Sequence, residues 1–412
     1  MAKVNGAQSV ETIPGRKIVL FSLFLILGLV CSQSLPIAFG IEKFNAAKPA
    51  LDVMLYVCLA FIMINVGREF ELDKSRWRSY TADYFIAMVT AAAPWLLICF
   101  YYMWLLPDDL FTSWDAWKEN LLLSRFAAPT SAGILFTMLA SAGLKNSWVY
   151  QKTRVLAIFD DLDTILLMIP LQIFMIGWRW QLAVVAVVVF GCLWFGWTRL
   201  DRFKMQQDWS SILGYATLMV FFCQGLYVFS SRLFGHDAAI HIEVLLPAFV
   251  LGMVMKHGHG SSKADDRAAT VISLFFMLLV GMSMPLINLE ADPLQSASVI
   301  ASLPMPSWGT IALHVIMVSL LSNIGKLTPM LFYRDRSLKE RLALSVGMFT
   351  RGEVGAGVIF IALGYHIGGP ILLISVLTLV FNLILTGGFV IIVKRLVIKA
   401  EKKAALAASA AA

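Results

Sequence analysis

Apolar residues along this 412-residue chain gather into twelve long segments that are separated by short polar stretches. Most of these segments hold roughly the 20 apolar residues with which an α-helix crosses about 30 Å of hydrocarbon. The pattern therefore predicts an all-α polytopic membrane protein of about twelve transmembrane helices. The predicted helices cover residues 17–35, 49–66, 83–106, 120–142, 155–177, 181–197, 209–230, 240–255, 270–289, 307–332, 338–364 and 370–397.

The composition excludes a water-soluble domain of this size. Hydrophobic residues make up 59% of the chain and charged residues 14%, and the mean hydropathy is +0.78. Soluble domains average about 45–50% apolar and about 25% charged residues, so the surface of this protein faces lipid. The five cysteines lie inside apolar segments without metal-ligand spacing, and they predict no disulfide framework and no metal site.

Lysine and arginine alternate between the two sets of loops. The N-terminus, every second loop and the C-terminus, each taken together with the helix ends beside it, hold 25 of the 33 basic residues, whereas the intervening loops hold 5. Because cytoplasmic loops carry the excess of Lys and Arg, this split predicts an even number of helices with both termini in the cytoplasm, and we expect a bacterial inner membrane. The net charge of +7 then reflects topology and requires no nucleic-acid partner.

Three carboxylates stand in the fifth predicted helix, at Asp160, Asp161 and Asp163. An ionisable group inside a membrane costs at least about 2.5–3.5 kcal/mol, so such residues are candidates for function. A poorly solvated carboxylate can hold either a proton or a small cation, and coupled exchange requires that competition. The alternative is that the acids cap the cytoplasmic end of the helix and stay hydrated, an interpretation that bears mainly on Asp163.

Three basic residues, Arg125, Lys326 and Arg351, lie inside predicted helices and away from the first and last turns. A buried ammonium needs a counter-charge, and the acids of the fifth helix offer one. We therefore predict that Lys326 pairs with Asp160. The alternative is that the side chain of Lys326 extends to the cytoplasmic surface near Arg334.

Two of the predicted helices contain breaks. Residues 127–133 place Pro129 among small side chains, and residues 347–357 hold four glycines together with Arg351 and Glu353. Unwound backbone at membrane depth is tolerated where it is buried or lines a cavity, and half-helix ends then face ions. Either segment alone is equally consistent with a kink or a close-packing site. Two breaks seven helices apart indicate an inverted repeat of helices three to five and ten to twelve.

Three histidines are of further interest. We interpret His314, about three turns before Lys326, as a packed neutral side chain, with pH sensing as the alternative. His257 and His259 are interpreted as part of a solvated turn and not as a metal site.

Six short motifs follow one another along the chain. They are Asn65 to Leu72 at the end of an early helix, Pro129-Thr130-Ser131, Asp160-Asp161, Val280 to Met284, Lys326, and Arg351-Gly352-Glu353. In this order they resemble the monovalent cation/proton antiporter superfamily, of the sodium/hydrogen exchanger type with a double aspartate. The resemblance extends from about Ile18 to Val397.

The resemblance implies a fold with two crossed broken helices, an inverted repeat and two parts. A core of helices at about 83–177 and 307–397 would move relative to a second domain that forms a homodimer, in elevator-like alternating access. We accordingly expect a cytoplasmic segment over 1–16, the transmembrane domain over 17–398 and a short Ala-rich cytoplasmic tail over 399–412.

The resemblance also implies roles for individual residues. Asp161 would be the main ligand of the proton and the monovalent cation, and Asp160 would be its partner, paired with Lys326. Thr130 and Ser131 would line the crossing of the broken helices. Arg351 and Glu353 would hold the second broken helix in place.

These roles describe an antiporter that exchanges protons for Na⁺ or Li⁺ and needs no cofactor. Whether K⁺ is also exchanged is left open. The double aspartate resembles the electrogenic branch of the superfamily. The chain departs from the relatives in two ways: the first break lacks a carboxylate, and Asp163 is an additional acid beside the pair.

Other functions use the same architecture or a similar pair of acids. A potassium efflux pathway or a sodium-coupled symporter is the nearer alternative. An intramembrane aspartyl protease is a remote one, because that chemistry joins carboxylates from two separate helices, one of them in a Gly-x-Gly-Asp setting that does not occur here. We therefore expect a transporter and not an enzyme.

Overall fold

The computed structural model describes residues 14–68, 77–177, 180–199, 202–234, 242, 244–255, 263–283, 299–300, 304–365 and 367–411. Helices dominate these ranges, as the predicted all-α class requires. The α-helices are α1 (Pro14–Phe39), α2 (Ile41–Arg68), α3 (Trp77–Leu105), α4 (Trp114–Ser124), α5 (Ala132–Ser141), α6 (Trp148–Ile176), α7 (Trp180–Thr198), α8 (Trp209–Phe234), α9 (Leu245–Val254), α10 (Lys263–Met282), α11 (Trp308–Gly325), α12 (Pro329–Phe332), α13 (Leu338–Gly347), α14 (Glu353–Gly364) and α15 (Gly369–Ala411). Two 3₁₀ turns, η2 (Asp108–Thr112) and η3 (Arg125–Ala127), flank α4.

Every predicted transmembrane segment falls on one of these helices or on a pair of them. Seven stretches of the described chain are long and apolar enough to cross a membrane. They are Val19–Phe39, Ile41–Arg68, Arg78–Leu105, Trp114–Ser141, Trp209–Leu233, Trp308–Phe332 and Gly369–Lys403. The total of twelve crossings stays a prediction.

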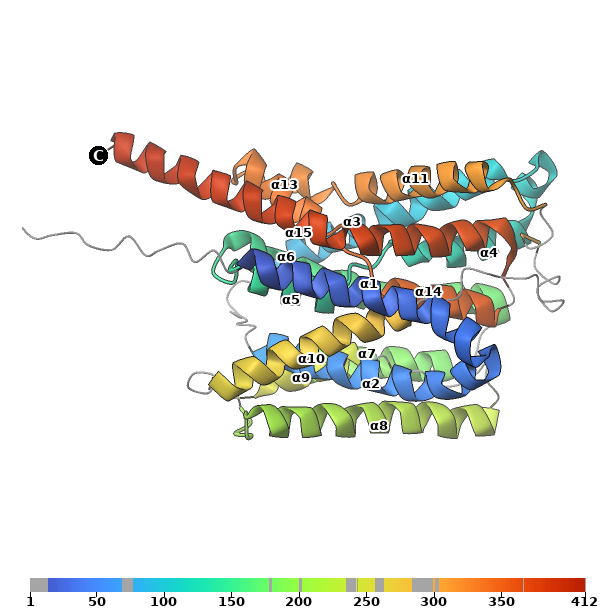
Figure 1. The fold of residues 1–412 in the computed structure, drawn as a ribbon, viewed down its shortest axis with the longest axis horizontal. Coiled ribbons are helices and arrows are strands. Elements are labelled where there is room, and N and C mark those ends of the chain that lie inside the picture. The colour runs from blue at the N-terminus through green and yellow to red at the C-terminus, as the bar shows by residue number, and fades with distance from the viewer. Residues whose placement is uncertain are drawn as a thin grey trace, which may run out of the picture.

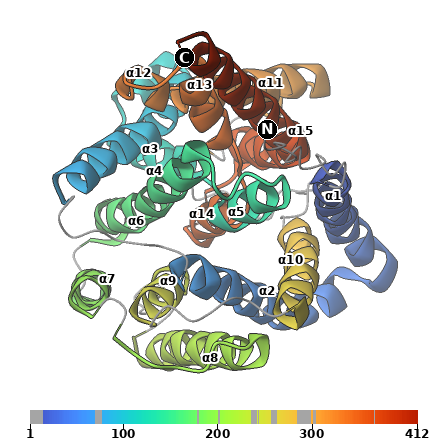
Figure 2. The same ribbon diagram turned by 90° about the vertical axis from the view of Figure 1, so that its left-hand side faces the viewer.

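The helices run mostly along the long axis of the molecule and form two groups (Figure 1). Seen from the end, α2, α7, α8, α9 and α10 make one group, and α3, α4, α6, α11, α13 and α15 make the other (Figure 2). The short helices α5 and α14 lie between the groups. This places the two predicted breaks at the centre of the molecule.

Glycines bring two helix pairs into backbone contact, α1 with α10 and α2 with α9. A Cβ atom at Gly28 of α1 would meet the carbonyl oxygen of Leu278 in α10, and one at Gly281 of α10 would meet α1 in return. Gly67 of α2 and Gly252 of α9 make the same kind of crossing. Small residues allow such close approach between membrane helices. Gly67 and Gly281, which belong to two of the six motifs, therefore act as packing positions near the ends of their helices.

Most helices begin or end some residues away from the predicted bounds, as α2 does by starting at Ile41 and not at residue 49. Three further differences concern where a helix stops. The tenth predicted helix ends at Gly325 and resumes as α12, because Pro329 has no backbone N–H with which to continue the ladder. The twelfth continues to Ala411 through the expected tail, since alanine is the best helix former. The ninth ends at Met282 and Ser283 forms a turn, and residues 284–289 of the predicted helix lie outside the described residues.

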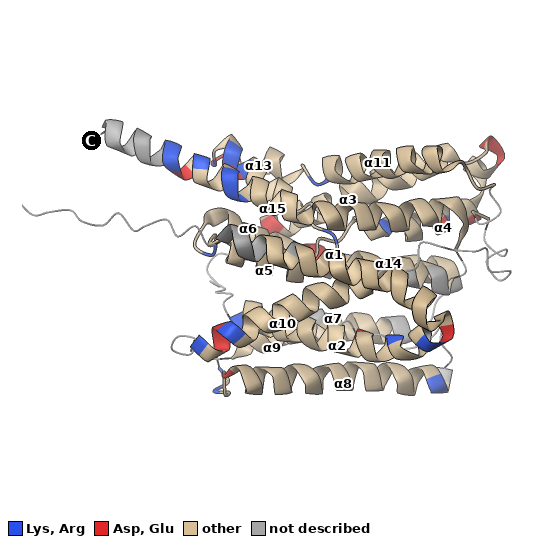
Figure 3. Cartoon of the chain, in the orientation of Figure 1, with Lys and Arg blue, Asp and Glu red and all other residues tan. Residues whose placement is uncertain are grey.

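Charged residues lie mainly at the two ends of the molecule (Figure 3). Many of the lysines and arginines gather at the end where α10 begins and α15 finishes. This arrangement agrees with the alternation found in the loops. The orientation of the termini across the membrane stays a prediction.

Candidate ion-binding site

The two broken helices cross at the centre of the molecule. The first break runs from η3 to Ser131, whose side chain caps the start of α5, and the second lies between α13 and α14. The backbone N–H of Ser131 donates to the carbonyl of Thr350 at 3.1 Å, and Thr130 Oγ1 donates to the carbonyl of Met348 at 3.2 Å. Each break thus supplies hydrogen-bond partners that the other has lost from its own helix.

Gly352 allows this close crossing. A Cβ atom at this position would lie 2.8 Å from Ser131 Oγ and 2.9 Å from Ser131 Cβ. A larger residue would push the two breaks apart. The glycine of the Arg-Gly-Glu motif is therefore required by the space between the helices.

Asp160 of α6 lies beside the crossing and is fully buried. Its Oδ2 atom accepts a hydrogen bond from the backbone N–H of Thr130 at 2.8 Å. The Nζ atom of Lys326 donates to its two carboxylate oxygens at 2.9 and 3.0 Å. The structure thus brings Asp160 and Lys326 together in the predicted ion pair, and neither side chain is exposed.

Asp161 follows on the same helix and is 2% exposed. At 3.6 residues per turn its side chain is turned by about 100° from that of Asp160. It lies close enough to Lys326 for the two charges to interact. Two buried acids, a lysine and the polar backbone of a helix break are thus brought together, and such a group can exchange a proton for a cation.

Arg351 lies in the second break and is also buried. Its Nη2 atom donates to Ser322 Oγ of α11 at 2.7 Å, and its Nη1 atom donates to the carbonyl of Met348 at 2.9 Å. These contacts hold the break against α11. Glu353 begins α14, and its side chain lies outside the described residues.

An ion pair between Arg125 and Asp163 is absent from the sequence prediction. The Nη2 atom of Arg125 lies 3.3 Å from Asp163 Oδ2, and the guanidinium stacks over the ring of Trp95 at 4.7 Å from its centroid. The sequence held a signal for this pair, because both residues are charges within predicted helices that require a partner.

A second cluster missed by the sequence prediction joins the ends of three elements. Asp83 of α3 accepts hydrogen bonds from Lys152 Nζ of α6 and from Tyr333 Oη after α12, both at 2.8 Å. Burial, and then the negative charge of Asp83, raises the pKa of Tyr333 above its ordinary value. Asp83 is the first residue of a predicted helix, and a charged residue at a helix end does not by itself indicate a buried contact.

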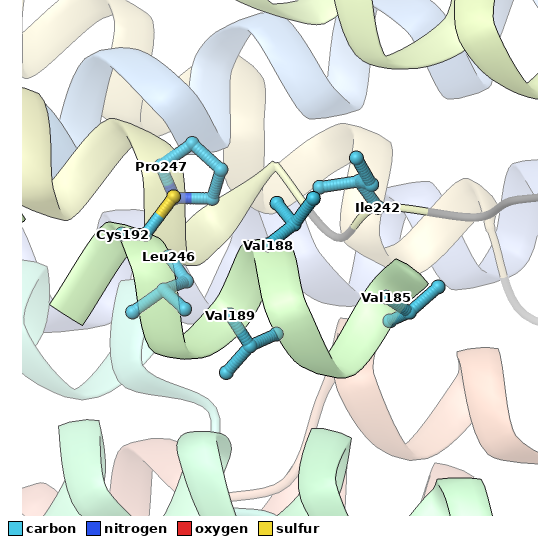
Figure 4. A pocket seen from close by; sticks show the side chains of 7 residues that line it. All are labelled: Val185, Val188, Val189, Cys192, Ile242, Leu246 and Pro247. Atoms are coloured by element: carbon cyan, nitrogen blue, oxygen red, sulfur yellow. The ribbon is translucent and has the colours of Figure 1, made fainter. Parts of the chain in front are cut away.

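The remaining candidates lie away from the crossing. His314 is half-buried, and its Nδ1 atom lies 2.7 Å from Tyr101 Oη of α3, a packed arrangement. His257 and His259 lie outside the described residues. An apolar pocket between α7 and α9 has no charged group in its lining, so it is no site for an ion (Figure 4). It is lined by Val185, Val188, Val189, Cys192, Ile242, Leu246 and Pro247.

The fold is similar to that of a known transporter. The structure of the sodium proton antiporter MjNhaP1 from Methanocaldococcus jannaschii at pH 8 matches with a TM-score of 0.55 and 16% sequence identity. The match covers 94% of this chain and 97% of that one. Comparison with curated proteins gives no match.

The sequence itself matches a family profile over nearly its whole length. The profile is that of the transmembrane region of the sodium/hydrogen exchanger, and the match covers residues 12–398. These residues include both breaks, the acids of α6 and Lys326. The chain therefore belongs to the sodium/hydrogen exchanger family of membrane-embedded cation/proton antiporters, which are transporters and not enzymes.

Proposed function

We propose that this protein exchanges protons for Na⁺ or Li⁺ at Asp160 and Asp161, with Asp161 as the main ligand. The observation that carries the proposal is the contact of Asp160 with Lys326 and with the backbone of the first break, inside the crossing of two broken helices. The similarity in fold to a sodium proton antiporter supports it. Thr130 and Ser131 would contribute oxygen atoms at the crossing.

Competition at the carboxylates provides the coupling. A proton and a cation each neutralise a buried carboxylate, so binding of one disfavours the other. When a cation takes the place of the ammonium beside Asp160, the buried Lys326 is left without its counter-charge and is driven to release a proton. That extra proton would make the exchange electrogenic.

We further propose elevator-like movement of a core relative to a second domain, within a homodimer. The core would be the helices at about 83–177 and 307–397, and the second domain would hold α1, α2 and α7 to α10. The paired glycine crossings of α1 with α10 and of α2 with α9 support an inverted repeat, because an offset of seven segments exchanges one crossing for the other.

Reconstituted vesicles test the proposed exchange. Purified protein in vesicles with an imposed pH gradient should dissipate the gradient when Na⁺ or Li⁺ is added, as a pH-sensitive dye reports. Asp161→Asn should abolish the response, because the amide cannot exchange a proton for a cation. Full activity in that variant would exclude the site.

Two further arms of the same assay test the finer statements. Addition of K⁺ instead of Na⁺ shows whether potassium is a substrate. Clamping the membrane potential with a potassium gradient and an ionophore, while Na⁺ drives the exchange, tests electrogenicity. A rate that does not change with the potential would contradict the role given to Lys326.

A further inference from the structure

The Arg125–Asp163 ion pair lies beside the candidate site, although the exchange just described does not use it. Arg125 is 0% exposed and Asp163 is 2% exposed. Among the described residues, the Nε and Nη1 atoms of Arg125 have no hydrogen-bond partner, and Asp163 is the acid that it contacts. Two buried charges in a membrane protein require a reason, because removal of either one leaves the other without compensation.

The position of the pair gives that reason. Arg125 and Thr130 stand at the two ends of the first break, and each contacts an acid of α6. Arg125 contacts Asp163 through its side chain, and Thr130 contacts Asp160 through its backbone N–H. Asp160 and Asp163 are three residues apart, so they share one face of α6. The break is therefore fastened to α6 at two points.

Cation binding would affect the two attachments differently. Asp160 also holds Lys326, and a cation must compete for that carboxylate. Asp163 is held by a guanidinium that also lies over the ring of Trp95, a second contact that stabilises its position. The second attachment can thus persist while the first one changes.

We propose that Arg125 and Asp163 are a positioning pair, which keeps the first break in register with Asp160, and that Asp163 is not a ligand of the transported cation. This inference rests on the proposed cation/proton exchange. It assigns the additional acid of this chain to the scaffold of the site.

The proposal predicts different results when one charge of the pair is removed and when both are removed. Arg125→Gln leaves Asp163 as a buried charge, and Asp163→Asn leaves Arg125 as one. Either single variant should shift the break and lower the maximal rate by about ten-fold or more, with a raised Na⁺ concentration at half-maximal rate. Arg125→Gln with Asp163→Asn removes both charges and keeps two side chains that can hydrogen-bond. This double variant should recover exchange to within roughly three-fold of the unmodified protein, with an unchanged pH profile.

The test measures Na⁺-driven exchange in vesicles for these three variants, next to gel filtration and thermal unfolding of each in detergent. Asp115→Asn serves as the control, because Asp115 is exposed and pairs with Lys118 in α4, the helix that directly precedes Arg125. It should exchange like the unmodified protein. A folded double variant as inactive as Asp163→Asn would overturn the proposal, since Asp163 would then take part in transport itself.

A charge-preserving variant covers the case in which the double variant does not fold. Arg125→Lys keeps a positive charge beside Asp163 but loses the guanidinium that lies over Trp95, so its exchange should be faster than that of Arg125→Gln, with the pH profile of the unmodified protein. A folded Arg125→Lys protein that exchanges no faster than Arg125→Gln would also overturn the proposal. If the unmodified protein exchanges no cation, the proposed function itself fails. An active unmodified protein with an inactive folded double variant refutes this inference alone.

Discussion

Lys326 is fully buried, and its ammonium lies 2.9 Å from Asp160. Truncation of one partner of a buried ion pair leaves an uncompensated charge, which destabilises proteins by about 3–5 kcal/mol. Lys326→Ala should therefore lower the stability of the folded protein by about that amount, apart from its effect on transport.

Thermal unfolding in detergent measures this loss. Lys339→Ala is the matched control, because Lys339 is exposed at the start of α13 and its removal should change stability by no more than about 0.5 kcal/mol. Equal melting temperatures for the two variants would show that Lys326 is not a buried partner of Asp160.

Tyr333 allows a prediction of pH dependence outside the membrane. Its hydroxyl donates to Asp83, and burial together with that acid raises the pKa of Tyr333. A pKa raised on folding favours the neutral phenol. Its contribution is complete below the ordinary tyrosine value of about 10 and is lost as the pH rises toward the higher value of the folded protein.

Tyr333→Phe should thus lower stability near neutral pH by about 0.5–1.5 kcal/mol and weaken its decline above about pH 10. Melting temperatures between neutral and strongly alkaline pH check both effects, with Tyr215→Phe in α8 as the control. An alkaline decline that is the same with and without the Tyr333 hydroxyl would contradict this account.

At the residue scale, the sequence predicted which charged residues are buried in the site better than it predicted which residues they contact. Asp160, Asp161 and Lys326 are conspicuous because ionisable groups are rare inside apolar segments. The pairing of Arg125 with Asp163 depends on how α4 packs on α6, and no local pattern reports that packing. The cluster around Asp83 was not predicted for another reason. Charged residues are common at helix ends, so a charge there does not indicate a buried ion pair.

At the scale of elements, the crossing of the two breaks limits the size of residue 352. Gly352→Ala would place its Cβ 2.9 Å from Ser131 Cβ, an atom that cannot move without the backbone. Overpacking of this kind costs about 1–3 kcal/mol. We expect a folded protein with exchange reduced by at least about ten-fold, because displacement of the break misplaces Thr130 beside Asp160.

Gly357→Ala is the control for this prediction. Gly357 lies in the same helix α14, and a Cβ atom there would have open space around it. Exchange in vesicles should be close to normal in the control. Normal exchange in Gly352→Ala as well would mean that the close crossing has no part in transport.

Elements were the most predictable level of the structure. Long apolar segments locate helices directly, and Pro129 and the glycines around Arg351 predicted both breaks. The division of the tenth segment at Lys326 was missed, although Pro329 could have indicated it. The prediction ran one helix through Pro329, and the structure instead ends α11 at Gly325, so that Lys326 caps the helix end.

At the scale of the whole molecule, elevator-like movement would require one group of helices to slide along the other. Gly133 of α5 packs on the ring of Phe276 in α10, so this contact joins the two proposed domains. A thiol cross-linker between Gly133→Cys and Phe276→Cys, in a chain without its five native cysteines, should stop exchange, and cleavage of the cross-link should restore it.

The control cross-link stays inside the proposed core. Tyr101→Cys and His314→Cys replace side chains that touch at 2.7 Å between α3 and α11. Helices that move together tolerate such a bond, so exchange should continue. Undiminished exchange with the first cross-link in place would contradict a sliding movement at this contact.

The central claim is that a proton and a cation compete for the buried carboxylates of α6. Purified protein in a weakly buffered solution near neutral pH tests it directly, because bound Na⁺ must then displace protons that a pH electrode or a dye can count. We predict proton release from the unmodified protein upon addition of Na⁺, and none from Asp161→Asn. Binding of Na⁺ without proton release, or equal release from the variant, would contradict the account.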